Sequence, residues 1–140
     1  MDKEYAIENG LELIRKAKIA MIGTNAGDGY PNIKAMLNLI SEGMKTIWFS
    51  TNTSSKRVAQ VLKDQKACVY YVDQDSFMGL MLIGEMEVLQ DEDSRKKLWS
   101  EGCEKYYPQG INDPDYSVLK FTAKQGNFYR GLQNISFEIE

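Results

Sequence analysis

Seven or eight short strand-like segments, separated by turn-forming residues and interrupted by only two or three helices, constrain the fold more than any other feature of this chain. Such a pattern is typical of an antiparallel barrel with peripheral helices and argues against a parallel α/β sheet. The sequence therefore predicts a mainly β fold. The expected strands cover residues 19–24, 33–40, 46–51, 67–72, 78–89, 116–123, 127–132 and 136–139.

Helical periodicity is limited to three regions. Residues 2–17 have apolar side chains near helical spacing, with acidic residues early and basic residues late, which suits the helix dipole. Further helices are expected over 54–64 and from about 91 to 103. The first three strands are expected to form a meander, and Gly79 and Gly84 are expected to kink the long strand over 78–89.

The chain has 140 residues and no histidine, and both facts exclude classes of function. This length suits one domain, expected over 1–140, and a net charge of −3 gives no cationic field for nucleic acid. Without histidine, Ser–His and Cys–His hydrolase sites and histidine-rich metal sites are excluded. Cys68 and Cys103 form no CxxC pair, which argues against a redox dithiol or zinc site. The dinucleotide-binding and P-loop glycine motifs are also absent.

The amino terminus does not have the pattern of a secretory signal. It begins with charged residues, Met1-Asp2-Lys3-Glu4, where a signal peptide would be basic and then apolar. The longest apolar run, over 77–84, is far shorter than the roughly 20 residues that a membrane helix needs. We expect a soluble cytoplasmic protein with no membrane partner.

One segment combines hydroxyl groups with positive charge. Residues 48–57 are expected to run from a strand through a loop rich in hydroxyl groups to a cationic helix start. Free backbone N–H groups, hydroxyls and a cation can together bind phosphate without a glycine loop. The alternative is that Thr53 or Ser54 only caps the helix while Lys56 and Arg57 are solvated.

The order of several motifs resembles the FMN-binding split-barrel family of pyridoxamine 5'-phosphate oxidase-like proteins. One stretch joins Ile47-Trp48-Phe49-Ser50-Thr51, Ser54-Ser55-Lys56, Val61 and Ala67-Cys68-Val69-Tyr70-Tyr71. A second stretch, similar to the general stress protein branch, joins Leu98-Trp99, Tyr106-Tyr107-Pro108-Gln109-Gly110, Asp113-Pro114 and Val118-Leu119-Lys120-Phe121. With Ile83-Gly84-Glu85-Met86-Glu87-Val88, the likeness spans residues 10 to 132.

The resemblance implies an antiparallel split β-barrel that binds FMN between the two subunits of a homodimer. Carried over by position, it implies that the cofactor phosphate or ribityl chain contacts Lys34, Ser54, Ser55 and Lys56. Ser50 and Thr51 would border the isoalloxazine ring. Trp99, Tyr106 and Tyr107 would border the partner's flavin, or else serve in ordinary packing.

One departure from the family pattern affects the phosphate site. Ser55 stands where the resemblance places an arginine, and Arg57 is not expected to replace it, because adjacent helical residues point about 100° apart. A lysine makes only point contacts where an arginine can clamp two oxygens, so we expect weaker FMN retention.

The resemblance implies an FMN-dependent oxidoreductase that transfers a hydride between bound FMN and a small donor, such as a reduced nicotinamide or another flavin. True pyridoxamine phosphate oxidation is not expected, since the chain has no histidine for that enzyme's Arg-x-His pair. The alternatives are a non-catalytic protein of the same fold that binds or buffers flavin or haem, and a relative that has lost its cofactor.

Overall fold

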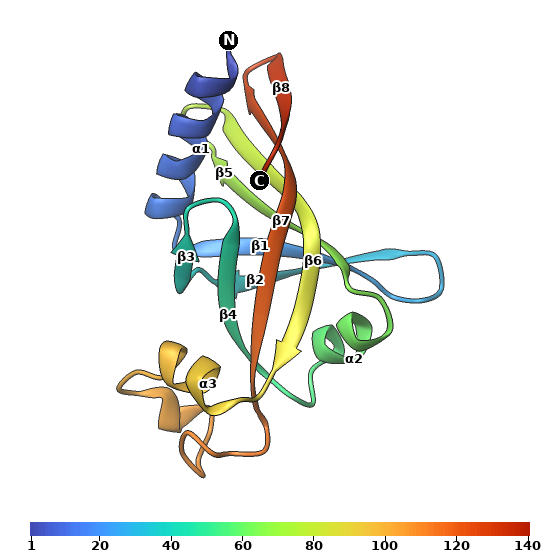
Figure 1. Ribbon diagram of the computed structural model, residues 1–140, viewed down its shortest axis with the longest axis vertical. Coiled ribbons are helices and arrows are strands. Elements are labelled where there is room, and N and C mark those ends of the chain that lie inside the picture. The colour runs from blue at the N-terminus through green and yellow to red at the C-terminus, as the bar shows by residue number, and fades with distance from the viewer.

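The computed structural model describes residues 1–140, and eight strands form its one curled antiparallel sheet (Figure 1). The strand order is β2-β1-β5-β6-β7-β4-β3, and β8 pairs with β7. The elements are α1 (Lys3–Lys16), β1 (Ile19–Asn25), β2 (Pro31–Leu37), β3 (Ile40–Glu42), β4 (Thr46–Asn52), α2 (Lys56–Lys63), β5 (Lys66–Asp73), β6 (Met78–Leu89), α3 (Glu92–Leu98), the 3-10 turn η1 (Cys103–Lys105), β7 (Tyr116–Arg130) and β8 (Gln133–Glu138). This confirms the predicted mainly β fold.

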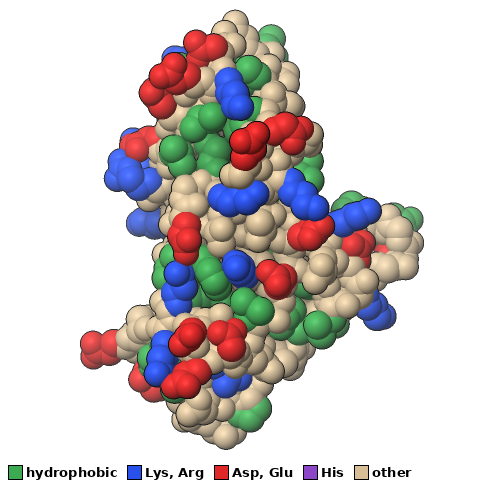
Figure 2. All heavy atoms as spheres, in the orientation of Figure 1, with side chains coloured by type: hydrophobic (Ala, Val, Ile, Leu, Met, Phe, Trp, Pro, Cys, Tyr) green, Lys and Arg blue, Asp and Glu red, His purple; other side chains and the backbone are tan.

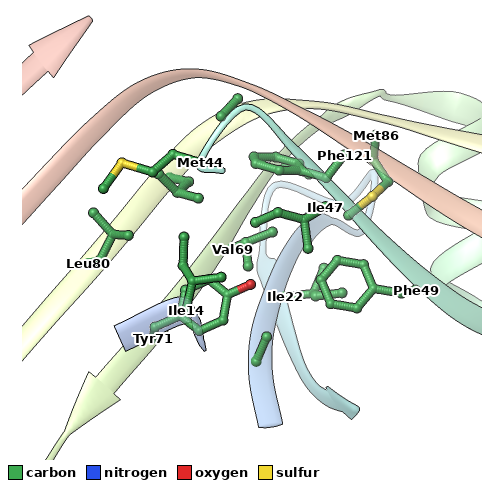
Figure 3. Packing of buried hydrophobic residues seen from close by; sticks show 14 of the residues in the cluster. Ile14, Ile22, Met44, Ile47, Phe49, Val69, Tyr71, Leu80, Met86 and Phe121 are labelled. Carbon is green, nitrogen blue, oxygen red and sulfur yellow. The ribbon is translucent and has the colours of Figure 1, made fainter. Parts of the chain in front are cut away.

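The sheet closes around an apolar core. Alternate residues of each central strand point inward, and Figure 3 shows Ile22, Ile47, Val69 and Phe121 directed toward one another inside the sheet. Helix α1 contributes Ile14 to this core. Burial of such side chains is the main favourable term in folding, so the curl of the sheet follows from its inward-facing residues.

The barrel is split where β2 faces β4. These two strands approach each other but do not pair: β2 pairs only with β1, and β4 pairs with β3 and β7. Of the predicted meander of the first three strands, the pairing of β1 with β2 is confirmed, but the pairing of β2 with β4 is wrong. The predicted strand over 33–40 is likewise two strands, because Asn38 interrupts it and donates its side-chain N–H to the carbonyls of Ile14 and Ala17 at the end of α1.

Two glycines lie at points where the long strands β6 and β7 shift register or pack closely against a neighbour. Gly84 lies at a register shift between β6 and β7, and a Cβ there would lie 2.0 Å from the Thr122 carbonyl oxygen. This confirms the expected kink at Gly84. At Gly126 the side chain of Phe137 fills the space that a Cβ would need. Strand β7 passes through 124–126 unbroken because Gln125 and Gly126 pair with β6 on one side and with β8 on the other. The two strands predicted over 116–132 are therefore one.

A small lobe covers one end of the barrel. It contains α3, η1 and the loop to β7, and it packs around a second apolar cluster that includes Leu98, Tyr107 and Tyr116 (Figure 1). The helix predicted to reach residue 103 ends at Leu98. No helix of the chain is both long and apolar enough to cross a membrane.

Candidate cofactor site

A cavity of about 710 Å³ lies where the barrel is split. Three parts of the chain form it: the edge of β2, the end of β4 with the start of α2, and the segment that follows α3. This volume is in the usual range for a cofactor or small-molecule site.

The polar wall of the cavity is formed by the end of β4 and the first turn of α2. Ser55 caps α2, because its hydroxyl accepts the N–H of Val58 at 3.3 Å, and Thr51 donates its hydroxyl to the same oxygen at 3.3 Å. A serine at this position is favoured because it satisfies a free N–H of the first turn. The wall therefore has a fixed geometry set by the sequence Thr51 to Lys56.

Asp115 holds the loop between β4 and α2 from behind. Its carboxylate accepts the side-chain N–H of Asn52 at 2.8 Å and the backbone N–H of Ser54 at 2.9 Å. These hydrogen bonds lower the pKa of the Asp115 carboxyl, and the bond from Asn52 has the largest effect. Ser54 therefore faces Asp115 and does not line the cavity.

Four cations line the cavity: Lys34 from β2, Lys56 and Arg57 from α2, and Lys105 from η1. None of them takes part in any of the five ion pairs of the chain. Only one acidic residue, Glu101, lines the same space. The cavity is thus cationic in a protein of net charge −3, which favours an anionic ligand.

Two of the three buried side-chain polar atoms without a hydrogen-bond partner belong to residues of this cavity. They are Ser50 Oγ and Arg57 Nε. Buried polar groups are almost always satisfied, so an orphan donor beside a cavity indicates a place for a ligand. Arg57 is the residue that we had not expected to contribute. The cavity extends along the first turn of α2, so both Lys56 and Arg57 reach it.

The open edge of β2 also faces the cavity. The Asn38 N–H donates to the Lys18 carbonyl oxygen at 3.0 Å, which fixes the hydrogen-bonding pattern beside it. In an antiparallel ladder only every second residue of β2 hydrogen-bonds to β1. By this alternation Ala35 and Leu37 direct their N–H and C=O groups away from β1. Both residues line the cavity. They offer a ligand a row of alternating backbone donors and acceptors.

The third wall is apolar and aromatic. Tyr107 is only 5% exposed and its ring lies 4.6 Å from that of Tyr116, whereas its neighbour Tyr106 is 67% exposed. Burial raises the pKa of Tyr107 to about 12. Leu98 and Cys103 complete this wall. Trp99 lies behind it, packed against Tyr107 and Tyr116.

The structure thus brings seven of the nine predicted site residues to one cavity: Lys34, Ser50, Thr51, Ser55, Lys56, Tyr106 and Tyr107. Ser54 and Trp99 do not line it. Arg57, Cys103 and the backbone edge of β2 also line the cavity but were not predicted from the sequence. The cationic dipeptide at a helix start was a usable signal for Arg57, but nothing in the sequence marked the open edge.

Comparison with protein families gives a match over almost the whole chain. The family described as "Pyridoxamine 5'-phosphate oxidase like" matches residues 6–139. Among curated proteins, none matches the chain.

Several solved structures are similar. A protein from Clostridium acetobutylicum related to general stress protein 26 of B. subtilis, of the pyridoxinephosphate oxidase family, is 52% identical, with a TM-score of 0.87 over 99% of this chain and 97% of that one. General Stress Protein 26 from Bacillus anthracis is 14% identical, with a TM-score of 0.77 over 99% and 100% of the two chains. A heme binding protein from Mycobacterium smegmatis is 15% identical, with a TM-score of 0.77 over 95% of this chain and 57% of that one. At such low identity the last two show a shared fold.

Proposed function

The chain belongs to the pyridoxamine 5'-phosphate oxidase-like family, and from this premise we propose that its cavity binds FMN and that the protein is an FMN-dependent oxidoreductase. The observation that carries the proposal is the Arg57 side chain, which lines the cavity, has a buried orphan Nε and takes part in no ion pair. A phosphate oxygen in the cavity would accept the unpaired N–H of Arg57 Nε.

The phosphate end of FMN is assigned to the polar wall. Lys56 and Arg57 of this wall and Lys34 of β2 supply positive charge, and Ser55 stands at the start of α2, where helix N–H groups favour an anion. Arg57 supplies the planar fork of donors that matches phosphate oxygens, which a lysine cannot. The loss of affinity expected from serine at position 55 is therefore compensated within the same turn.

The ring end of FMN is assigned to the remaining walls. The free N–H and C=O groups of Ala35 and Leu37 suit the alternating carbonyl and N–H groups on the polar edge of an isoalloxazine ring. Tyr106 offers an exposed ring face, and the buried Tyr107 packs against it, so the two exclude water from one side.

When bound, FMN supplies the hydride chemistry, and the chain supplies binding, orientation and electrostatics. The donor is a small molecule such as a reduced nicotinamide or another flavin. The cations keep the phosphate fixed, and backbone hydrogen bonds from β2 hold the ring's polar edge. The two free thiols, Cys68 and Cys103, agree with a reducing compartment, so we place the protein in the cytoplasm.

A homodimer is part of the proposal, because the outer face of the sheet over β2, β1, β5 and β6 is apolar. Ile33 is 73% exposed and Leu37 61%. The register places these side chains on one face with four further exposed apolar residues, Ile19, Met21, Val72 and Ile83. Monomeric proteins rarely expose so large an apolar face. By contrast, acidic and basic side chains are interspersed on the face that carries β4 and β7 (Figure 2).

Sedimentation of the wild-type protein and of Ile33→Glu tests the homodimer. We expect a wild-type dimer and a variant that dissociates at micromolar concentration, because a charge would be buried without a partner. A wild-type monomer would contradict the dimer.

A second candidate function is haem binding without turnover. It is favoured by Cys103, Met36 and Tyr106, which line the cavity and are side chains able to ligate haem iron in place of histidine. Their presence beside a cationic wall also suits the carboxylates of haem.

The chromophore of the purified protein tests both candidates. We expect a yellow protein whose pigment, released on denaturation, is FMN, and bleaching by NADH or NADPH under anaerobic conditions. A red protein that releases haem would support the second candidate. A colourless protein that takes up no added FMN would contradict the first.

A local test is Lys56→Ala, with the solvent-exposed Lys63→Ala on the same helix as control. If the Lys56 ammonium pairs with phosphate, FMN binding should weaken by roughly 1 to 3 kcal/mol. Equal affinities of the two variants would show that Lys56 is merely solvated.

A further inference from the structure

The third orphan atom of the chain lies outside the cavity. It is Nε of Arg95, a partly buried residue of α3 that does not line the cavity. Arg95 takes part in none of the five ion pairs. A buried N–H of a guanidinium without a hydrogen-bond partner is costly, so its position calls for an explanation.

Arg95 and Tyr116 bind each other reciprocally. Arg95 Nη2 donates to the Tyr116 carbonyl oxygen at 2.9 Å and to the Asp113 carbonyl oxygen at 3.3 Å. In return the Tyr116 hydroxyl donates to the Arg95 carbonyl oxygen at 2.8 Å. The guanidinium carbon also lies 5.7 Å from the centre of the Tyr116 ring, within cation–π range. These contacts lock α3 to the start of β7.

The neighbouring carboxylate does not pair with Arg95. Asp113 is buried, and its two oxygens accept the backbone N–H groups of Gln109 and Asp115. Arg95 thus binds two carbonyl oxygens and a ring face. This pair of contacts depends on the planar shape of the guanidinium as well as on its charge. A lysine cannot reproduce both contacts.

Tyr116 connects this lock to both sides of the cavity. Its ring lies 4.6 Å from that of Tyr107, which lines the aromatic wall, and 5.4 Å from that of Trp99. Its backbone pairs with Asn52 of β4, a residue of the polar wall. A shift of Tyr116 would therefore move the aromatic wall relative to the polar wall.

We propose that Arg95 is a positioning residue for the cofactor: it fixes Tyr116, and through it the Tyr106 and Tyr107 wall against which the flavin ring lies. The inference rests on the proposed FMN site. It assigns a role to a residue that touches neither cofactor nor substrate.

The test compares wild-type protein, Arg95→Lys and the control Lys96→Ala, each saturated with FMN. Lys96 lies next in sequence but is exposed and pairs only with Glu92, at 2.7 Å. The readout is the fluorescence and absorption envelope of the bound flavin. At saturation these report the surroundings of the ring and not the affinity or the stability of the fold.

For Arg95→Lys we expect a changed envelope, weaker quenching of the bound flavin, and affinities for FMN and riboflavin that fall together by about 3- to 10-fold, the value of an aromatic contact. Lys96→Ala should match wild type. If the lysine variant binds too weakly to saturate, near-UV circular dichroism of the ligand-free protein replaces the readout, and a changed tyrosine signal supports the inference.

A bound-state spectrum identical to wild type, or an unchanged dichroism signal, would overturn the positioning role and leave the FMN site standing. Failure of the wild-type protein to take up FMN would instead overturn the proposed function and, with it, this inference.

Discussion

Two walls of the cavity, the polar wall and the aromatic wall, are stabilised in different ways. The polar wall belongs to the main sheet and is held by hydrogen bonds, chiefly from Asn52 and Ser54 to Asp115. The aromatic wall belongs to the small lobe and is held by ring packing around Tyr116. The polar wall therefore carries unpaired positive charges and is anchored by hydrogen bonds to the sheet. The aromatic wall consists of tyrosine rings and is anchored in the separate apolar cluster of the small lobe.

Because the two walls have separate supports, charge recognition and ring recognition can be altered separately. Changes on the polar wall should affect the ligand's phosphate, and changes on the aromatic wall should affect its ring or the stability of the lobe.

Substitutions of the neighbours Tyr107 and Tyr106 should differ most in their effect on the free energy of unfolding. Tyr107→Ala removes a buried ring and should lower the free energy of unfolding by about 3 kcal/mol or more, as for other large-to-small core changes. Tyr106→Ala, at an exposed position, should change the free energy of unfolding by less than about 0.5 kcal/mol. Denaturant unfolding measures both, and similar losses would show that the lobe has no core of its own.

Arg57→Ala should act on the phosphate alone. Loss of a charge-assisted pair should weaken FMN binding by about 1.5 to 3 kcal/mol. Riboflavin, which has no phosphate, should bind as before. Fluorescence titration with both ligands measures this, with Lys63→Ala, near the other end of α2, as control. An equal loss for riboflavin would place Arg57 at the ring.

Asp115→Ala should loosen the polar wall from behind. The loop that carries Asn52 and Ser54 loses its anchor, so FMN affinity should fall by about 3- to 10-fold, less than for Arg57→Ala. Asp93→Ala, at an exposed position of α3, is the matched control. If FMN titration finds the affinity unchanged, the loop geometry does not depend on Asp115.

Alkaline pH should destabilise the aromatic wall. Burial raises the pKa of Tyr107 from 10.0 to about 12, so the folded state keeps the phenol neutral. This contribution to stability is complete below pH 10 and is lost as the pH rises through 12, because the unfolded chain releases its proton first. Melting temperatures across this window should fall less steeply for Tyr107→Phe; parallel curves would contradict this cause.

Much of the fold could be predicted because its signals are local. Period-two apolar patterns marked β5 and β6 within one residue at each end, and turn residues separated the strands. What failed depends on contacts distant in sequence. Asn38 ends β2 because its amide bonds to the end of α1, and β7 continues through Gly126 because this residue pairs with both β6 and β8.

The candidate site was predicted in part for the same reason. Ser50 to Lys56 lie in one stretch of sequence, so their association was visible. The contribution of Arg57 depends on where the cavity meets the first turn of α2, which helical geometry alone does not give. The free edge of β2 exists only because β4 pairs elsewhere, and Arg95 acts through Tyr116, 21 residues away.

Titration of the wild-type protein with FMN and with riboflavin, followed by flavin fluorescence, decides whether the cavity is an FMN site. The cationic split of the barrel should take up one FMN per chain and prefer it to riboflavin by at least about tenfold, the value of one charge-assisted contact. Equal affinity for the two ligands, or no uptake of either, would contradict an FMN site built on Lys34, Lys56 and Arg57.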